Sequence, residues 1–152
     1  MAAASEIKQT LAETLLGSAP APSGEAGWAS EARAAARARL AEMGGPVKRD
    51  EYWKYTDPAR LTAPLALADA AAEAAAPAPA FEDFETADFV FVNGRFRPDL
   101  SHGPVEGVEI LPMADALSTD ISFARDLFGA LEAAGQEKVA RPLAALNTAL
   151  AD

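Results

Sequence analysis

Three of the chain's eleven aromatic residues stand within four consecutive positions, at Tyr52, Trp53 and Tyr55. Much of the remaining sequence is alanine, so few large side chains exist from which a core could be built. Each of these rings can bury about 150–250 Å². We therefore expect a compact core to gather here, with the rings as packing anchors. The alternative is a binding surface for a partner protein.

The residues between and beside the rings complete a six-residue stretch that we name the aromatic motif. Its members are the candidate partner surface: Glu51, Tyr52, Trp53, Lys54, Tyr55 and Thr56. Asp50, Glu51 and Lys54 could act as acids or bases, but no nucleophile, metal ligand or phosphate-binding loop stands beside them. The motif therefore does not predict a catalytic site, and we do not expect an enzyme.

The chain has 152 residues and a mass of 15.8 kDa, which suits one domain that folds without disulfides or metals. It contains no cysteine, which excludes thiolate metal sites, cysteine catalysis and disulfides. It has one histidine, His102, and a single such ligand is not enough for a zinc or iron site made by this chain alone. We expect no cofactor bound by this chain.

The formal net charge is −10, which argues against nucleic acid and anionic membranes as partners. Residues 1–60 carry eight basic and eight acidic groups, whereas residues 61–152 carry five basic and fifteen acidic ones. This excess indicates a solvated surface or a docking face for a basic partner. The sequence lacks an apolar run long enough to span a membrane and a basic start typical of a signal peptide, so we expect a cytoplasmic protein.

Two helices are expected in the first part of the chain. Ser5 can cap a helix with Ile7, Leu11 and Leu15 on one stripe, ended by Gly17 and followed by a turn-rich stretch. We therefore set residues 1–24 apart as an N-terminal helix with a flexible segment. A second helix is predicted from Glu25 or Trp28 to Met43. Its apolar face is Trp28, Ala32, Ala35 or Ala36, Leu40 and Met43, with Arg33, Arg37 and Arg39 solvated elsewhere.

Turn signals define the middle of the chain. Gly44 and Pro46 end the second helix, and Thr56 or Asp57 caps a short turn that begins at Pro58. Alanine and proline dominate residues 64–80, which we interpret as a linker. Asn93-Gly94 predicts a type I′ turn between strands at 89–92 and 95–97, and residues 108–111 predict a third strand. His102 is expected in an exposed loop.

Two further helices are expected to close the chain. Ile121, Ala124, Leu127 or Phe128, and Leu131 repeat at helical spacing, with Asp120 as a cap. Residues 139–151 carry Pro142 near a first turn and a stripe of Leu143, Leu146 and Leu150. That stripe reaches the last residues with no stop signal, from which we expect the chain to be cut from a longer protein. The predicted fold class of residues 25–152 is α+β, with helices first, a small mostly antiparallel sheet in the middle and helices at the end.

The aromatic motif is also where a family resemblance begins. With Gly44-Gly45-Pro46 before it and Asp57-Pro58 after it, the motif resembles the amino-terminal region of SufD, a scaffold subunit of bacterial iron-sulfur cluster assembly. Further matches follow in order, at residues 91–96, 100–101, 107–110, 142–143 and 146–149. Each match is short, but their order and spacing make the resemblance fairly specific over residues 28–152.

The resemblance implies a role in iron-sulfur cluster assembly together with SufB and the ATPase SufC. In that family the chain continues into a long β-helix and a terminal helical region, whereas this sequence stops at Asp152 and has no β-helix core. The family's cluster-related residues and ATPase docking site lie in those later regions, so none can be assigned to positions here. The resemblance concerns the amino-terminal domain alone.

Two other classes of function stay open. The chain could be a stand-alone acidic protein-protein interaction module, with the aromatic motif and the acidic second half as recognition surfaces. It could also be an enzyme that works with carboxylates alone, since Asp83, Glu85 and Asp88 crowd the entry to the predicted hairpin. These acids do not follow the pattern of a lined pocket, which favours a solubilising role for them.

Overall fold

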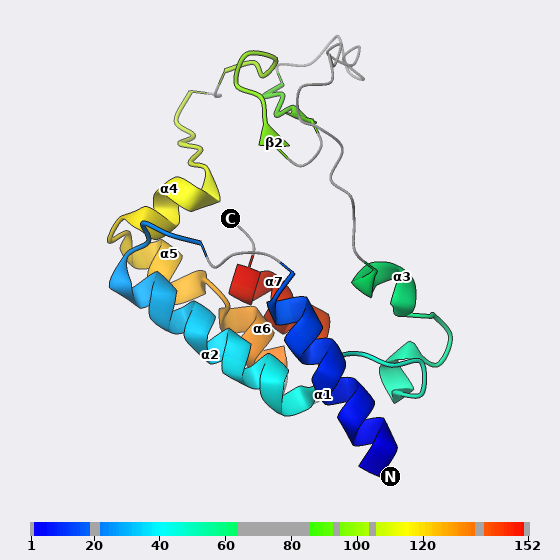
Figure 1. Ribbon diagram of the computed structural model, residues 1–152. Coiled ribbons are helices and arrows are strands. Elements are labelled where there is room, and N and C mark those ends of the chain that lie inside the picture. Colours follow the sequence, from blue (N-terminus) through cyan, green and yellow to red (C-terminus); the bar gives the residue numbers. More distant parts are fainter. Residues whose placement is uncertain are drawn as a thin grey trace. The chain divides into compact units, whose positions relative to one another are not determined.

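The computed structural model describes residues 2–18, 22–63, 86–92, 95–103, 106–135 and 139–150 (Figure 1). The chain divides into two compact units, which are described separately. Unit 1 comprises Met1–Pro64 and Pro112–Asp152, and unit 2 comprises Leu65–Leu111. The linker predicted at residues 64–80 lies outside the described residues.

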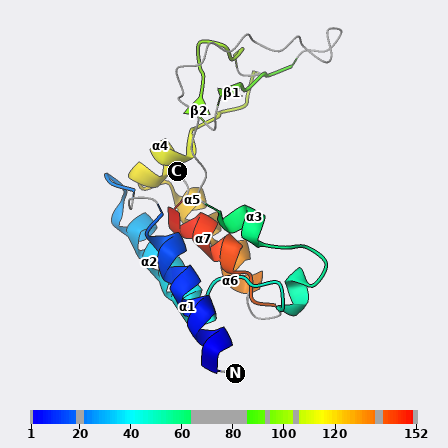
Figure 2. The same cartoon turned by 45° about the vertical axis from the view of Figure 1, so that its right-hand side comes forward.

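Three helices form the centre of unit 1. These are α1 (Ala2–Leu16), α2 (Gly27–Met43) and α7 (Pro142–Leu150), and each contacts the other two (Figures 1 and 2). Their shared core is Ala12, Leu40 and Ala145, with Leu16, Met43 and Leu146 packed against it. Because most of the buried residues are alanine, the helices can approach closely and need few large side chains. The core that the sequence places at the aromatic motif lies instead at this helix contact.

The α2 helix ends as predicted but buries a different face. Gly44 has φ 72°, and its N–H donates to the carbonyl of Leu40 at 2.9 Å. The buried residues are Ala29, Arg33, Ala36 and Leu40. The prediction of a solvated Arg33 is therefore wrong, since its exposed fraction is 4%. The nearby carboxylate of Glu25, 2.7 Å away, compensates its charge and makes this burial possible.

The α1 helix forms where the sequence predicts it, with a different beginning. Ser5 lies inside the helix rather than at its cap, while Gly17 follows the last residue and its N–H donates to Glu13. Leu15 is buried, whereas Ile7 is 61% exposed. Packing against α2 and α7 places α1 in unit 1. The domain boundary that the sequence suggests at residue 24 stays a prediction.

The segment after α2 holds two short helical turns. The first is the 3₁₀ turn η1 (Glu51–Trp53), and the second is α3 (Ala59–Thr62). The backbone N–H of Ala59 donates to the carboxylate of Asp57 at 3.0 Å. Asp57 therefore accepts the hydrogen bond expected of a cap, although α3 begins one residue later than predicted and has Pro58 at its N-cap position.

The one helix predicted around residues 121–131 is replaced by shorter helices. These are α5 (Ser122–Leu127) and α6 (Ala130–Gly135), and they are preceded by α4 (Met113–Ser118), a helix that the sequence did not predict. Gly129, with φ 71°, separates α5 from α6, and consequently Leu127 and Leu131 are 69% and 90% exposed. Asp120 does not cap α5 but pairs with Arg125 at 3.1 Å.

Unit 2 contains one short antiparallel pair, β1 (Phe91–Val92) and β2 (Arg95–Phe96). Phe91 pairs with Phe96 and Val92 with Arg95, and a bond from Arg97 N to the carbonyl of Val90 extends the pairing. This register leaves a two-residue connection, Asn93-Gly94, whose predicted type I′ turn lies outside the described residues. His102 is exposed as predicted, and its backbone N–H donates to the carbonyl of Asp88.

The third strand predicted at residues 108–111 is wrong, because these residues join no β-ladder. Helix dominates the described part of the chain, and each paired strand is only two residues long. The predicted α+β class with its small sheet is therefore not confirmed. Within the described ranges, no helix combines the length and the apolarity needed to cross a membrane.

Candidate functional site

The backbone of the aromatic motif is anchored by the residue that precedes it. The Asp50 carboxylate accepts from the ammonium of Lys8 on α1, at 2.9 and 3.1 Å, and from the backbone N–H of Val47 at 3.1 Å. The carbonyl of Asp50 then accepts from Trp53 N, and that of Trp53 from Thr56 N, at 2.8 and 3.0 Å. Two successive turns thus hold the motif at a fixed point beside α1.

The two glycines before the motif set its distance from α1. Gly45 N donates to the carbonyl of Lys8 at 2.7 Å, so the chain crosses directly over this helix. A Cβ atom at Gly45 would lie 2.5 Å from Leu11 Cγ, and one at Gly44 would lie 2.7 Å from Lys8 Cβ. Residues without side chains are needed here because the backbone passes too close to α1 for any other.

The side chains of the motif mostly face solvent. Tyr52 is 55% and Tyr55 90% exposed, while Trp53 is partly buried. The prediction that all three rings are packing anchors is therefore wrong for both tyrosines. The backbone explains this outcome, because the 3₁₀ turn and the bend after it point successive side chains in different directions and leave only one ring facing the protein.

Neighbouring charges surround the exposed rings. The Lys54 ammonium lies 4.9 Å from the centre of the Tyr55 ring and also pairs with Glu51 at 2.8 Å. The guanidinium of Arg141, directly before α7, lies 5.8 Å from the centre of the Tyr52 ring. Tyr52 in turn meets Trp53 edge to face, with ring centres 5.4 Å apart. These contacts orient the rings without burying them.

The indole N–H of Trp53 is buried and has no hydrogen-bond partner among the described residues. The structure thus brings all six motif residues into one exposed turn. Sequence analysis missed Lys8 and Arg141, which hold the turn in place, because both are distant in the sequence. The sequence shows only that Arg141 is a basic residue directly before the first turn of α7, and not that it contacts the motif.

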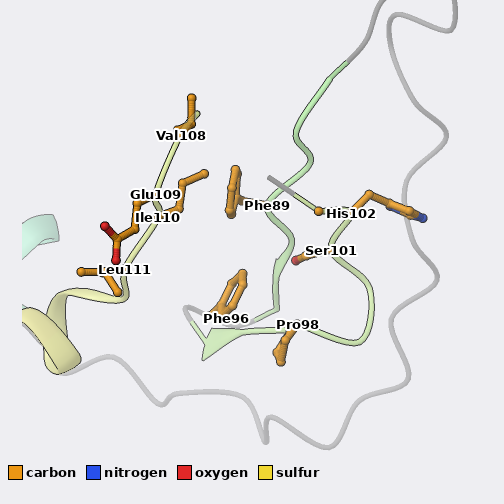
Figure 3. Close-up of a pocket in the computed structure, with 10 residues that line it drawn as sticks. Phe89, Phe96, Pro98, Ser101, His102, Val108, Glu109, Ile110 and Leu111 are labelled. Carbon is orange, nitrogen blue, oxygen red and sulfur yellow. The ribbon is translucent and has the colours of Figure 1, made fainter. Parts of the chain in front are cut away.

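A second candidate site is a pocket of about 510 Å³ in unit 2 (Figure 3). Phe89 and Phe96 form one wall, and the segment from Val108 to Leu111 forms the other. Most of its lining is apolar, and Glu109 and His102 are its ionisable members. Such a lining suits apolar contact with a ligand or a side chain.

The adjacent Ser101 and His102 do not form a nucleophile and base. The Ser101 hydroxyl donates to the carbonyl of Arg97 at 2.7 Å and accepts from Val90 N at 3.0 Å. Figure 3 shows the imidazole of His102 pointing away from the two phenylalanine rings. Ser101 therefore has a structural role, which is to tie the loop after β2 to the residue before β1.

The pair Arg97 and Asp99 lies beside this pocket on the protein surface. Arg97 Nε and Nη2 donate to the two carboxylate oxygens of Asp99. These hydrogen bonds lower the pKa of Asp99 below its ordinary value, and they raise the pKa of Arg97. The side chains of Arg97 and Asp99 are 33% and 56% exposed, so the pair stiffens the loop locally rather than forming a reactive centre.

Carboxylates do not gather into a metal centre in the part of the chain that is described. No group of three or more potential ligands lies close enough to hold an ion there. Of the acids considered for an enzyme, Asp83 and Glu85 lie outside the described residues. Asp88 takes part in the backbone bridge with His102.

Comparison with known proteins gives this chain no relative. No protein-family model, no curated protein and no solved structure matches it.

Proposed function

We propose that this chain is the amino-terminal α+β domain of a SufD-like scaffold subunit and acts through contacts with other proteins. In this proposal it contributes to iron-sulfur cluster assembly together with SufB and the ATPase SufC, in the cytoplasm. It is not an enzyme, and it binds no metal, cofactor, nucleic acid or membrane itself. The order of the SufD-like segments along residues 28–152 supports the family assignment.

The observation that carries the proposal is the exposure of the aromatic motif. Tyr55 is 90% exposed and Tyr52 is 55% exposed, although the backbone on both sides is fixed by Asp50 and by turns. A rigid turn with exposed tyrosines is typical of a recognition surface, because such rings lose little conformational entropy on binding. The helical core does not depend on these two rings, since it consists of other residues.

The partner assignment is tested by co-purification. A tagged version of the whole product of the gene that encodes this chain is expressed with SufB and SufC, and the complex is isolated. We expect both proteins to co-purify with it. Recovery of neither protein would overturn the SufD assignment.

The cofactor part of the proposal needs a separate measurement. The 152-residue chain is treated with iron and sulfide under anaerobic conditions, desalted and analysed for both elements. We expect a colourless protein, because cluster ligation normally requires thiolates and this sequence contains none. Stoichiometric iron and sulfide on this chain would contradict the proposal.

The second candidate function is a stand-alone acidic interaction module. The exposed aromatic motif and the net charge of −10 favour it equally well. The two functions differ in their partners: a module of this kind would bind another protein through the motif but would recover neither SufB nor SufC.

A further inference from the structure

Basic side chains concentrate around the aromatic motif of this acidic protein. Six of the thirteen lysines and arginines lie within residues 47–62 or contact them: Lys8, Lys48, Arg49, Lys54, Arg60 and Arg141. We name these six the basic patch. Residues 47–62 contain four of these basic residues and three acids, Asp50, Glu51 and Asp57, so this segment has a formal charge of +1. The whole chain, in contrast, carries −10.

Four of the basic residues outside the patch form ion pairs. Arg33 pairs with Glu25, Arg39 with Glu132, Arg97 with Asp99 and Arg125 with Asp120. Within the patch, Lys8 and Lys54 are paired, whereas the exposed Lys48, Arg49 and Arg60 make no ion pair in the described part of the chain. Three exposed basic side chains without an ion pair therefore lie close in sequence to the motif, and among the described side chains outside the patch only the half-buried Arg37 is likewise without an ion pair.

From this arrangement we propose that the aromatic motif and the basic patch bind an acidic segment of a partner protein, an inference that rests on the proposed function. Exposed Tyr52 and Tyr55 supply the apolar contact area, and Lys48, Arg49 and Arg60 attract carboxylates. The partner carries aromatic or aliphatic side chains between its acids, because the rings of the motif offer flat apolar faces to pack against.

Two observations favour an acidic protein over a nucleic acid. A nucleic acid strand extends beyond the patch, where the net charge of −10 repels its phosphates. The available basic groups are also few and close in sequence, whereas binding of a phosphate backbone normally uses a longer series of cations. A short acidic peptide needs only a local positive surface, which the patch provides.

The proposal is tested with a defined probe, the fluorescein-labelled peptide Gly-Glu-Glu-Phe-Glu-Glu-Phe-Glu-Glu-Gly. Fluorescence anisotropy gives its affinity for the 152-residue chain at low salt, and the same peptide with lysine in place of every glutamate is the charge control. We expect the acidic peptide to bind and the basic one not to bind. Raising the salt should weaken the binding several-fold, because the charges involved are exposed.

Matched variants locate the binding. Arg49→Glu and Arg125→Glu change the net charge equally, but Arg125 lies on α5 outside the patch and is 50% exposed. We expect Arg49→Glu to lower the affinity for the acidic peptide about tenfold and Arg125→Glu to lower it less than about twofold. Lys48→Glu repeats the test at a second patch position. Circular dichroism of each variant verifies that it folds.

The contribution of the aromatic rings to binding is measured with Tyr55→Ala, which should lower the affinity for the peptide about fivefold or more. Chemical shifts of the backbone amides and of the Trp53 indole N–H then show where the peptide sits. We expect changes confined to residues 47–62 and to the neighbourhood of Arg141. The indole is a single, well-separated reporter inside the motif.

Three outcomes would overturn the inference. They are absence of binding at about 1 mM peptide, equal losses for the Arg49 and Arg125 variants, and tighter binding of a single-stranded oligonucleotide at the same residues. None of these measurements involves SufB or SufC. A negative peptide result with successful co-purification removes only this inference, whereas the opposite pair of results removes only the SufD assignment.

Discussion

The side chain of Arg33 is buried in unit 1, with an exposed fraction of 4%, and three groups contact its guanidinium. Its Nε is 2.7 Å from the Glu25 carboxylate, its Nη1 donates to the carbonyl of Thr148 at 3.1 Å, and its guanidinium lies 5.4 Å from the centre of the Phe128 ring. The contacts join the loop before α2, the residue after α5 and the end of α7. Through these contacts the Arg33 side chain ties the three segments together.

Removing one member of this pair should be strongly destabilising. We expect Arg33→Met to lower the free energy of unfolding by about 3–5 kcal/mol, because Glu25 then keeps a buried, unpaired charge. The double variant Arg33→Met with Glu25→Gln should lose less than the single one. Urea unfolding of both proteins measures the difference. A loss of under about 1 kcal/mol in the single variant would show that water compensates Glu25.

The exposed carboxylate of Asp99 gives a pH-dependent prediction of known sign. Its pKa is lowered below its ordinary value of 3.8 by hydrogen bonds from Arg97. The pair therefore contributes stability above the unfolded-state pKa and loses it as the pH falls through the lower, folded-state pKa. Carboxyl-carbon NMR titration should show Asp99 titrating below its ordinary value. Arg97→Ala should raise the pKa toward the ordinary value, and an unchanged titration would refute the contact.

At the scale of elements, the crossing of residues 44–46 over α1 depends on the absence of side chains. We expect Gly45→Ala to destabilise the protein by about 1–3 kcal/mol, since the added methyl overlaps Leu11 and forces it to move. Gly27→Ala is the matched control, because a Cβ atom there meets nothing within 4 Å. Thermal unfolding of both variants makes the comparison. Equal effects would mean that the crossing can shift without cost.

The helices after residue 112 show which element boundaries a sequence pattern can predict. The stripe of Ile121, Ala124, Leu127 and Leu131 satisfies helical spacing, yet the chain turns at Gly129. A Cβ atom added at Gly129 would lie 3.0 Å from Thr148 Cγ2, so the turn lies against α7. That constraint comes from a residue nineteen positions away and is invisible to local periodicity. The helix-ending role of Gly44 and the capping role of Asp57 were predictable because each depends on residues nearby in the sequence, whereas the close approach of Gly44 to Lys8 was not.

For the whole molecule, sequence reasoning located most helices but misplaced the core. It assumed that burial follows the largest side chains, whereas α1, α2 and α7 bury alanines and leave both tyrosines of the motif exposed. Close helix approach makes small residues effective core residues, and their contribution depends on three helices meeting. The motif was found from its composition alone. The exposure of its rings, and the contacts from Lys8 and Arg141, required the folded arrangement.

The two compact units differ in how much apolar surface they bury and in how many backbone hydrogen bonds they form. Unit 1 buries its helices around Ala12, Leu40 and Ala145. In unit 2 the described hydrogen bonds are few, and Phe89, Phe91, Phe96, Val108, Ile110 and Leu111 are all at least 38% exposed. Local opening costs least where few buried contacts must be broken. Unit 2 should therefore open far more often than the centre of unit 1.

Hydrogen exchange measured by NMR on the intact chain tests this difference. The amides of α2 and α7 should exchange slowest, near the rate set by global unfolding, whereas those of residues 86–92 and 95–103 should exchange by local opening. Adding mild denaturant separates the two mechanisms, because only global opening accelerates steeply with its concentration. Equal protection in both units, with the same denaturant dependence, would show that the chain opens as one cooperative structure and that the exposed phenylalanines of unit 2 do not mark a weaker unit.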